Sequence, residues 1–344
     1  MTIRLTWKRL AAGALGLLLL GMGFAWSGLF PIAASSGHWA ITDWFLHWTM
    51  QNSARTYSSF QTPEEVRDDR AMVSAAGHFH QSCEVCHGAP GVPPSPVMQA
   101  ATPPAPNLAT TVGHYDDREL FWIVRHGVKY TGMPAWPAGD RPDEVRRMVG
   151  FLRRLPGMKA EEYRALTAAP PGPLSGCTGC HGTDGRGRGQ ADIPVIAGQN
   201  EQFLLSALRD FASGKRQGAV MQVAASGMSE AEMRAAARHF AELPGLRAGT
   251  LASGHAIAEH GLPGKQLPAC RSCHAPGKNA PVLTGQHPAF LAARLRQWRG
   301  DDAVTDVRKP RDPMAVIARR IPETEIDSLA EALSRGDTGS APHR

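Results

Sequence analysis

The sequence has few aromatic and hydrophobic residues for its length. Of 344 residues, 42% are hydrophobic and 7% are aromatic, which is little for three large apolar cores. The sequence also lacks basic clusters interleaved with aromatic residues, so its net charge of +6 gives no support to nucleic-acid binding. The low apolar content indicates that something other than side chains fills part of the interior.

Cysteine is also scarce, and every cysteine belongs to one repeated pattern. The three copies are SCEVCHG with Cys83, Cys86 and His87, GCTGCHG with Cys177, Cys180 and His181, and ACRSCHA with Cys270, Cys273 and His274. A structural zinc site needs four ligands, and three cysteine pairs do not divide evenly into four-cysteine sites. A thioredoxin-like dithiol needs its pair at the start of a helix after a strand, and no strand-rich run precedes these pairs.

Three Cys-x-x-Cys-His segments predict three covalently attached haems of the c type. Residues i and i+3 share one face of a helical turn, so both thiols can reach the two vinyl groups on one edge of the porphyrin. The adjacent histidine is carried beneath the ring, where it can bind the iron.

The N-terminal region contains the one long apolar run of the chain. Arg4, Lys8 and Arg9 precede an uncharged stretch from Leu10 to Phe30, which is long enough to cross a bilayer. Basic residues stay on the cytoplasmic side, so residues 1–36 are predicted to anchor the chain in the bacterial inner membrane with the remainder in the periplasm. A cleaved signal peptide is the alternative, because the small residues of PIAASSG could be cut.

Residues 37–70 are predicted to form an amphipathic helix and a linker. Ile41, Trp44, Phe45 and Trp48 recur at helical spacing, and tryptophan favours the boundary between lipid and water. Packing on the first haem domain, or on the membrane helices of a partner subunit, is an equally good interpretation.

Clusters of proline and glycine divide the rest of the chain into three modules. They occur in RLPGM, TAAPPGPLSG and ELPGLRAG, and they predict three all-α haem domains in tandem, the first module at 71–158, the second at 170–247 and the third at 248–338. The second and third modules repeat each other, because residues 193–216 align with residues 280–302.

A low-spin haem needs a second axial ligand, and the methionine thioether is a suitable soft donor. We expect Met133 in YTGMPAWP, Met221 and Met314 to fill this role. Cys177 and Met221 are separated by 44 residues, as are Cys270 and Met314. Met228 and Met233 are rivals in the second module. Ligation by a second histidine is a further alternative, with candidates His78, His80, His114, His126, His239, His255, His260 and His287.

A proline lies between the histidine and the methionine of each module. These are Pro106, Pro194 and Pro281, each followed after one residue by leucine or isoleucine. We expect each proline carbonyl to accept the proton on the second ring nitrogen of the haem histidine, which would fix the ring. A simple turn proline is the alternative.

The second and third modules resemble the dihaem cytochrome c4 group. The shared residues are Pro194, Gly198, Gln199, Phe203, Leu204 and Met221, and again Pro281, Gly285, Gln286, Phe290, Leu291 and Met314. The first module is similar to a class I cytochrome c, through CEVCHG and TGMPAW. Two departures stand out. The segment AAPPGPLSG rules out a continuous helix before Cys177, and such a break is predicted before this motif alone. Ala275 replaces the glycine that usually follows the histidine.

A haem whose axial positions are filled by histidine and methionine has no open site for a substrate, which indicates electron transfer. The resemblance implies a membrane-bound carrier between a quinol-oxidising complex or periplasmic dehydrogenase and a terminal oxidase or other acceptor. A dedicated cytochrome subunit of a membrane alcohol or sugar-acid dehydrogenase is the alternative. A dihaem peroxidase or gas sensor would need a displaceable ligand. We expect the haem on Cys177 and Cys180 to bridge the first module and the c4-like pair.

Overall fold

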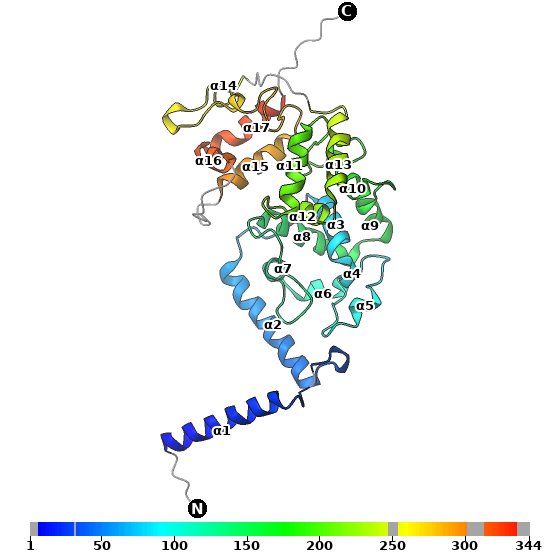
Figure 1. Cartoon of the computed structure of the whole chain (residues 1–344), viewed down its shortest axis with the longest axis vertical. Helices are drawn as coiled ribbons and strands as arrows, with labels where there is room; N and C mark the ends of the chain where they lie inside the picture. The colour runs from blue at the N-terminus through cyan, green and yellow to red at the C-terminus, as the bar shows by residue number, and fades with distance from the viewer. Residues whose placement is uncertain (1–5, 31, 247–253, 301–312, 336–344) are drawn as a thin grey trace, which may run out of the picture.

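The computed structural model describes residues 6–30, 32–246, 254–300 and 313–335. In this part of the chain the regular structure is helical, and strand pairing is limited to the isolated bridges Ala89–Val92 and Leu262–Leu267. The molecule is elongated, with α1 at one end and α14 to α17 at the other (Figure 1). The all-α prediction is confirmed.

Two helices precede the first module. Helix α1 is Trp7–Trp26, and its 20 residues span about 30 Å, the thickness of a bilayer core. Helix α2 is Ala40–Gln61. Its first half exposes Trp44, Phe45 and Trp48, and its second half packs against α7, where the rings of Tyr57 and Trp122 stack at 5.8 Å. The amphipathic segment therefore joins the first module through one half and leaves an apolar surface on the other.

The first module is built around the crossing of two helices, α3 and α8. Its helices are α3 (Met72–Ser82), α4 (Glu84–His87), α5 (Pro96–Gln99), α6 (Leu108–Thr111), α7 (Asp117–His126), α8 (Pro142–Arg154) and, after the predicted boundary, α9 (Ala160–Thr167). Phe79 of α3 contacts Phe151 of α8 with ring centroids 5.2 Å apart, and Phe121 and Tyr163 close the same core. Among the described residues, four of the five buried phenylalanine and tyrosine side chains lie here, since packed rings bury large areas.

The second and third modules have matching helix arrangements. Their helices are α10 (Ser175–His181), α11 (Glu201–Ala212), α12 (Ala219–Ser226) and α13 (Glu230–Glu242), then α14 (Ala256–His260), α15 (Pro288–Arg299), α16 (Pro313–Arg320) and α17 (Ile326–Arg335). Helix α11 packs against α12 and α13, just as α15 packs against α16 and α17. The sequence repeat is therefore a structural repeat.

The helix break before Cys177 is present, but it is not unique to the second module. Helix α9 ends at Thr167 and α10 begins at Ser175. In the third module α14 ends at His260, a bridged turn follows, and Cys270 begins a 3₁₀ segment. The expectation that only the second module lacks a continuous preceding helix is therefore wrong. The prolines at 263 and 268 interrupt the third module in the same way.

Two buried glutamines join the second and third modules by reciprocal hydrogen bonds. The side chain of Gln286 accepts from the Val195 N–H at 2.8 Å and donates to the Val195 carbonyl at 2.9 Å. Gln199 accepts from the Val282 N–H at 2.8 Å and donates to the Val282 carbonyl at 3.1 Å. Each glutamine thus satisfies the hydrogen-bonding needs of both the N–H and the carbonyl of one residue in the other module.

His78 of α3 is a buried histidine beside the second module. Its ring is 3% exposed and lies 4.6 Å from that of Trp136. Burial lowers the pKa of His78 to about 4. The neutral imidazole is therefore the form that the fold accommodates.

We expect His78→Phe to flatten the acid dependence of stability. The unfolded chain takes up a proton on His78 near its ordinary pKa and the folded chain does not, so stability falls as the pH drops from the unfolded towards the folded value. This residue should account for about 2 kcal/mol of lost stability between pH 7 and pH 5. Guanidinium chloride unfolding at both pH values measures it, with exposed His239→Gln as control. An unchanged slope in His78→Phe would contradict the assignment.

We expect Gln286→Leu to destabilise the protein by about 2 to 4 kcal/mol, because it leaves the buried N–H and carbonyl of Val195 without partners. Gln202→Leu is the matched control, since Gln202 is exposed on α11. Denaturant unfolding of the haem-loaded chain compares the two. Equal stability of both variants would show that the reciprocal bonds do not hold the modules together.

Candidate functional site

Each histidine of the three Cys-x-x-Cys-His segments donates a hydrogen bond to a proline carbonyl. The Nδ1–O distances are 2.8 Å from His87 to Pro106, 3.2 Å from His181 to Pro194 and 2.8 Å from His274 to Pro281. The partners are 19, 13 and 7 residues apart in sequence. Loops of three different lengths therefore end in the same contact, at the prolines that the sequence singled out.

These hydrogen bonds fix which ring nitrogen can bind a metal. Because Nδ1 donates to the carbonyl, Nε2 is the nitrogen that each ring presents as a ligand. Burial lowers the pKa of His87, His181 and His274, and the hydrogen bond partly offsets this shift. Burial thus favours the neutral form of all three rings, which is the form that can bind a metal.

Cys83, Cys177 and Cys270 pack against hydrophobic clusters, Cys273 is exposed, and none of the six cysteines is in a disulfide. Burial raises the pKa of the Cys83 thiol to about 12 and that of Cys270 to about 11, and it raises those of Cys177 and Cys180 as well. Such positions favour an uncharged sulfur, and the thioether that links a haem c to its cysteine carries no charge. Their environment therefore fits the predicted linkage.

The backbone conformation of the Cys-x-x-Cys-His segment differs between the first two modules and the third. Cys86 and His87 lie on α4, and all of the second motif lies on α10; a glycine with positive φ, Gly88 or Gly182, ends each helix directly after the histidine. In the third module the motif begins as a 3₁₀ segment, Cys270–Ser272, and Ala275 does not adopt a positive φ. The replacement of glycine by alanine thus coincides with a different local backbone, while the bond from His274 to Pro281 is kept.

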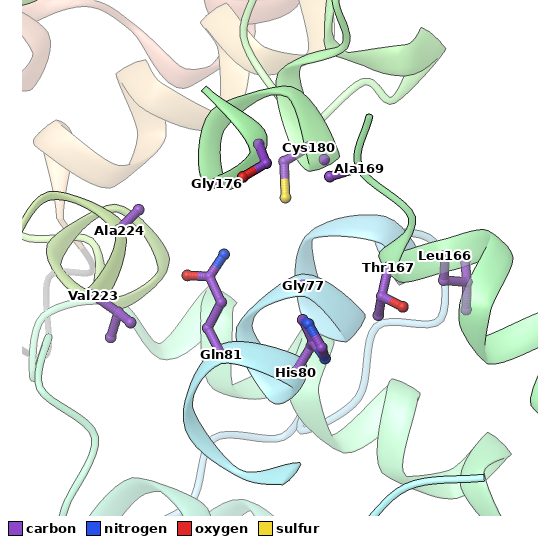
Figure 2. Close-up of a pocket in the computed structure, with 12 residues that line it drawn as sticks. Gly77, His80, Gln81, Leu166, Thr167, Ala169, Gly176, Cys180, Val223 and Ala224 are labelled. Atoms are coloured by element: carbon purple, nitrogen blue, oxygen red, sulfur yellow. The ribbon is translucent and has the colours of Figure 1, made fainter. Parts of the chain in front are cut away.

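A cavity of about 570 Å³ lies between the first and second modules. Figure 2 shows the sulfur of Cys180 pointing into it from α10, with Gly77 and Gln81 of α3 opposite and Val223 of α12 at the side. A Cβ at position 77 would lie 2.9 Å from the Cys180 sulfur, so glycine is needed for this close approach. The cavity has the size of a cofactor pocket.

A second, smaller cavity lies beside the third motif. It has about 150 Å³ and is lined by His274 and the loop up to Thr284, with Gly198 and Asn200 contributed by the second module. Among the described residues, no three His, Cys, Asp or Glu side chains are placed to hold one metal ion. The larger cavity, beside Cys180, has room for much of a cofactor, whereas about 150 Å³ is too little to enclose a haem.

The three candidate methionines lie between helices or at their starts. Met133 is in the loop between α7 and α8, Met221 is in the first turn of α12, and Met314 is in the first turn of α16. All three are partly buried. The rival Met233 is buried on α13, and Met228 follows α12.

Local sequence patterns assign no structural role to Gln199, Gln286 or Glu144. Both glutamines follow a glycine at equivalent points of the repeat, so their recurrence was the available signal. Nothing local distinguishes Glu144, which lies near the start of an amphipathic helix like many exposed acids. Its burial, with 7% of its surface exposed, is visible only in the folded chain.

Residues 70–152 match the family model described as cytochrome c oxidase, cbb3-type, subunit III. The thiosulfate dehydrogenase electron acceptor of Thiomonas intermedia (strain K12) is 33% identical over 182 residues, which is 49% of this chain and 82% of that protein. Cytochrome c4 of Pseudomonas aeruginosa (strain PAO1) is 31% identical over 140 residues, 38% of this chain and 69% of that protein.

The crystal structure of reduced cytochrome c4 from Pseudomonas stutzeri covers 47% of this chain and 94% of its own, with 27% identity and a TM-score of 0.40. The sequence relatives and the Cys-x-x-Cys-His segments together assign the chain to a family. The chain belongs to the family of c-type cytochromes that includes cytochrome c4, and it is an electron-transfer protein with covalently bound haem c.

Proposed function

We propose that the chain binds three haems c, one on each Cys-x-x-Cys-His segment, and relays single electrons through the periplasm. The observation that carries this proposal is the hydrogen bond from histidine to proline, which recurs in all three modules. A segment without a haem would have no need to hold its histidine in this way. The shortened loop of the third module keeps the contact, which supports a haem there too.

His87, His181 and His274 would each supply one ligand to a haem iron, and Met133, Met221 and Met314 would supply the other. Bound haem iron provides a reversible one-electron couple, and a thioether ligand raises its potential. With both positions filled by protein groups, the residues hold the metal and exclude a substrate. The chain is then a carrier of electrons and not a catalyst.

The modules are placed for a relay along the chain. Cys180 faces α3 across the larger cavity, so a haem attached there would lie against the first module and would bridge it to the pair formed by the second and third. The reciprocal glutamine contacts hold the second and third modules together. Helix α1 anchors the assembly to the inner membrane, since its length and composition suit a bilayer.

Electrons enter from a periplasmic dehydrogenase or a quinol-oxidising complex and leave to a terminal oxidase or another acceptor. Two relatives carry the name thiosulfate dehydrogenase electron acceptor, which makes a thiosulfate-oxidising dehydrogenase the first donor to consider. The exposed apolar half of α2 lies along the chain between the anchor and the first module, where it can contact the membrane surface.

Replacement of each methionine by histidine tests the ligands and the haem count. We expect Met133→His, Met221→His and Met314→His each to remove about one third of the far-red methionine-to-iron charge-transfer band and to lower one midpoint potential, because imidazole favours ferric iron more than a thioether does. Intact mass should still show three covalent haems. Met148→Leu in the core of the first module, and Met233→Leu, should keep the full band. A full band in Met221→His, with loss in a Met228 or Met233 variant, would overturn that assignment.

Reduction of the full-length protein in detergent tests the donor. We expect thiosulfate with its dehydrogenase to reduce all three haems, thiosulfate alone to reduce none, and membranes with a terminal oxidase to reoxidise them. Stopped-flow absorbance follows both steps. Failure of reoxidation, together with rapid reduction only by a co-purifying alcohol or sugar-acid dehydrogenase, would favour a dedicated subunit of that enzyme.

A further inference from the structure

A buried carboxylate of the first module is bonded to the backbone of the second. Glu144, near the start of α8, accepts from the Ala219 N–H at 2.8 Å. Its carboxylate also accepts from Trp136 Nε1 at 3.3 Å and lies 3.0 Å from the Arg141 guanidinium. Burial raises the pKa of the Glu144 carboxyl, and Arg141 and the Ala219 N–H oppose that shift. Because each of these partners is a donor, the geometry favours the ionised carboxylate.

Two of these partners, Ala219 and Trp136, belong to the segments that carry the proposed methionine ligands. Ala219 begins α12 and precedes Met221 by two residues. Trp136 lies three residues after Met133 in the loop between α7 and α8, and its ring packs on His78. Glu144 therefore connects the methionine segment of the first module with that of the second.

Arg141 completes the cluster from the same end of α8. It forms a paired contact with Asp143, at 2.8 Å for each of its two hydrogen bonds, and donates to the Gln217 carbonyl at 3.5 Å. Gln217 and Ala219 flank a buried glycine just before α12. The first module thus holds both sides of the turn that leads into the Met221 helix.

A second set of contacts joins the first module to the segment of the second module around Asp192. Asp192 accepts from the Ser74 hydroxyl of α3 at 2.5 Å and lies 3.6 Å from Arg147 of α8. Two residues later, Pro194 accepts the hydrogen bond of His181. Side chains of the first module therefore fix the segment behind the histidine as well as the segment that carries the methionine.

We propose that side chains of the first module position the two segments that carry the proposed ligands of the second haem. Glu144 positions the segment of Met221, and Arg147 and Ser74 position the segment behind His181. The potential of that haem then depends on the docking of the first module. This inference rests on the proposed ligands His181 and Met221, and it assigns Glu144 as a positioning residue that does not itself touch the haem. Its distinctive feature is that the group comes from a different module from the one it serves.

The effect on the second haem has a clear sign. Negative charge near a haem stabilises the ferric form, so removal of the carboxylate should raise the potential. Loss of the side chain should go further, because the Ala219 N–H, the Trp136 indole and Arg141 would lose a buried partner and the turn before Met221 could shift.

Redox titration and far-red absorbance of the full-length, haem-loaded chain test the proposal. Glu144→Gln keeps an acceptor for Ala219, so we expect an intact far-red band and a rise in potential that is largest for the second haem. Glu144→Ala should weaken the band by up to about one third, the share of one haem in three, and should shift the same potential. Glu162→Gln is the matched control, since Glu162 is exposed on α9.

Met221→His identifies the haem that should respond. The proposal is overturned if Glu144→Gln leaves all three potentials at the values of the control, or if the potential that moves most is not the one lowered by Met221→His. If Met221→His leaves the band and all potentials unchanged, the ligand assignment fails instead, which separates the two conclusions. Should Glu144→Ala yield no holoprotein, Glu144→Gln carries the test alone.

Discussion

The hydrogen bond from a histidine Nδ1 to a proline carbonyl is the contact around which each module is organised. It selects the tautomer, turns Nε2 outward and joins the motif to a segment up to 19 residues away. Proline suits the accepting position because its ring restricts the backbone and so holds the carbonyl in one direction. In the second and third modules the next residue, Val195 or Val282, is fixed in turn by a glutamine from the neighbouring module.

The modules are joined by polar contacts to the backbone as well as by apolar packing. Gln199, Gln286 and Glu144 are all buried, and each bonds to a backbone group in a different module. Such bonds are directional, and a buried donor or acceptor without its partner is costly, so they specify one arrangement where apolar contact alone would allow several. The contacts that dock the modules therefore also shape the surroundings of their histidines.

The distribution of apolar residues matches this arrangement. The first module has a continuous core with four buried aromatic rings, Phe79, Phe121, Phe151 and Tyr163, whereas in the second module Leu204, Ala237 and Phe240 form a much smaller cluster. The larger cavity lies beside that weakly packed module. A haem attached at Cys180 would supply there the apolar contacts that side chains do not.

The sequence by itself determined the chemistry and the repeated plan. Spacing within one helical turn predicted the haem segments. The prolines that accept from the histidines were found by their recurrence, and AAPPGPLSG correctly predicted a break before Cys177. These inferences succeed because they depend on local backbone geometry and on covalent chemistry. The interrupted helix of the third module was missed, although its prolines were visible, because the resemblance suggested a continuous one.

Only the tertiary structure decided which modules touch and through which groups. The contacts of Gln286, Glu144 and Asp192 join residues 91, 75 and 118 positions apart. No local pattern encodes such pairs, because a glutamine or a carboxylate looks the same in sequence whether it faces water or completes the backbone of another module. Their burial, and with it their influence on the site, arises only when the helices of separate modules pack together.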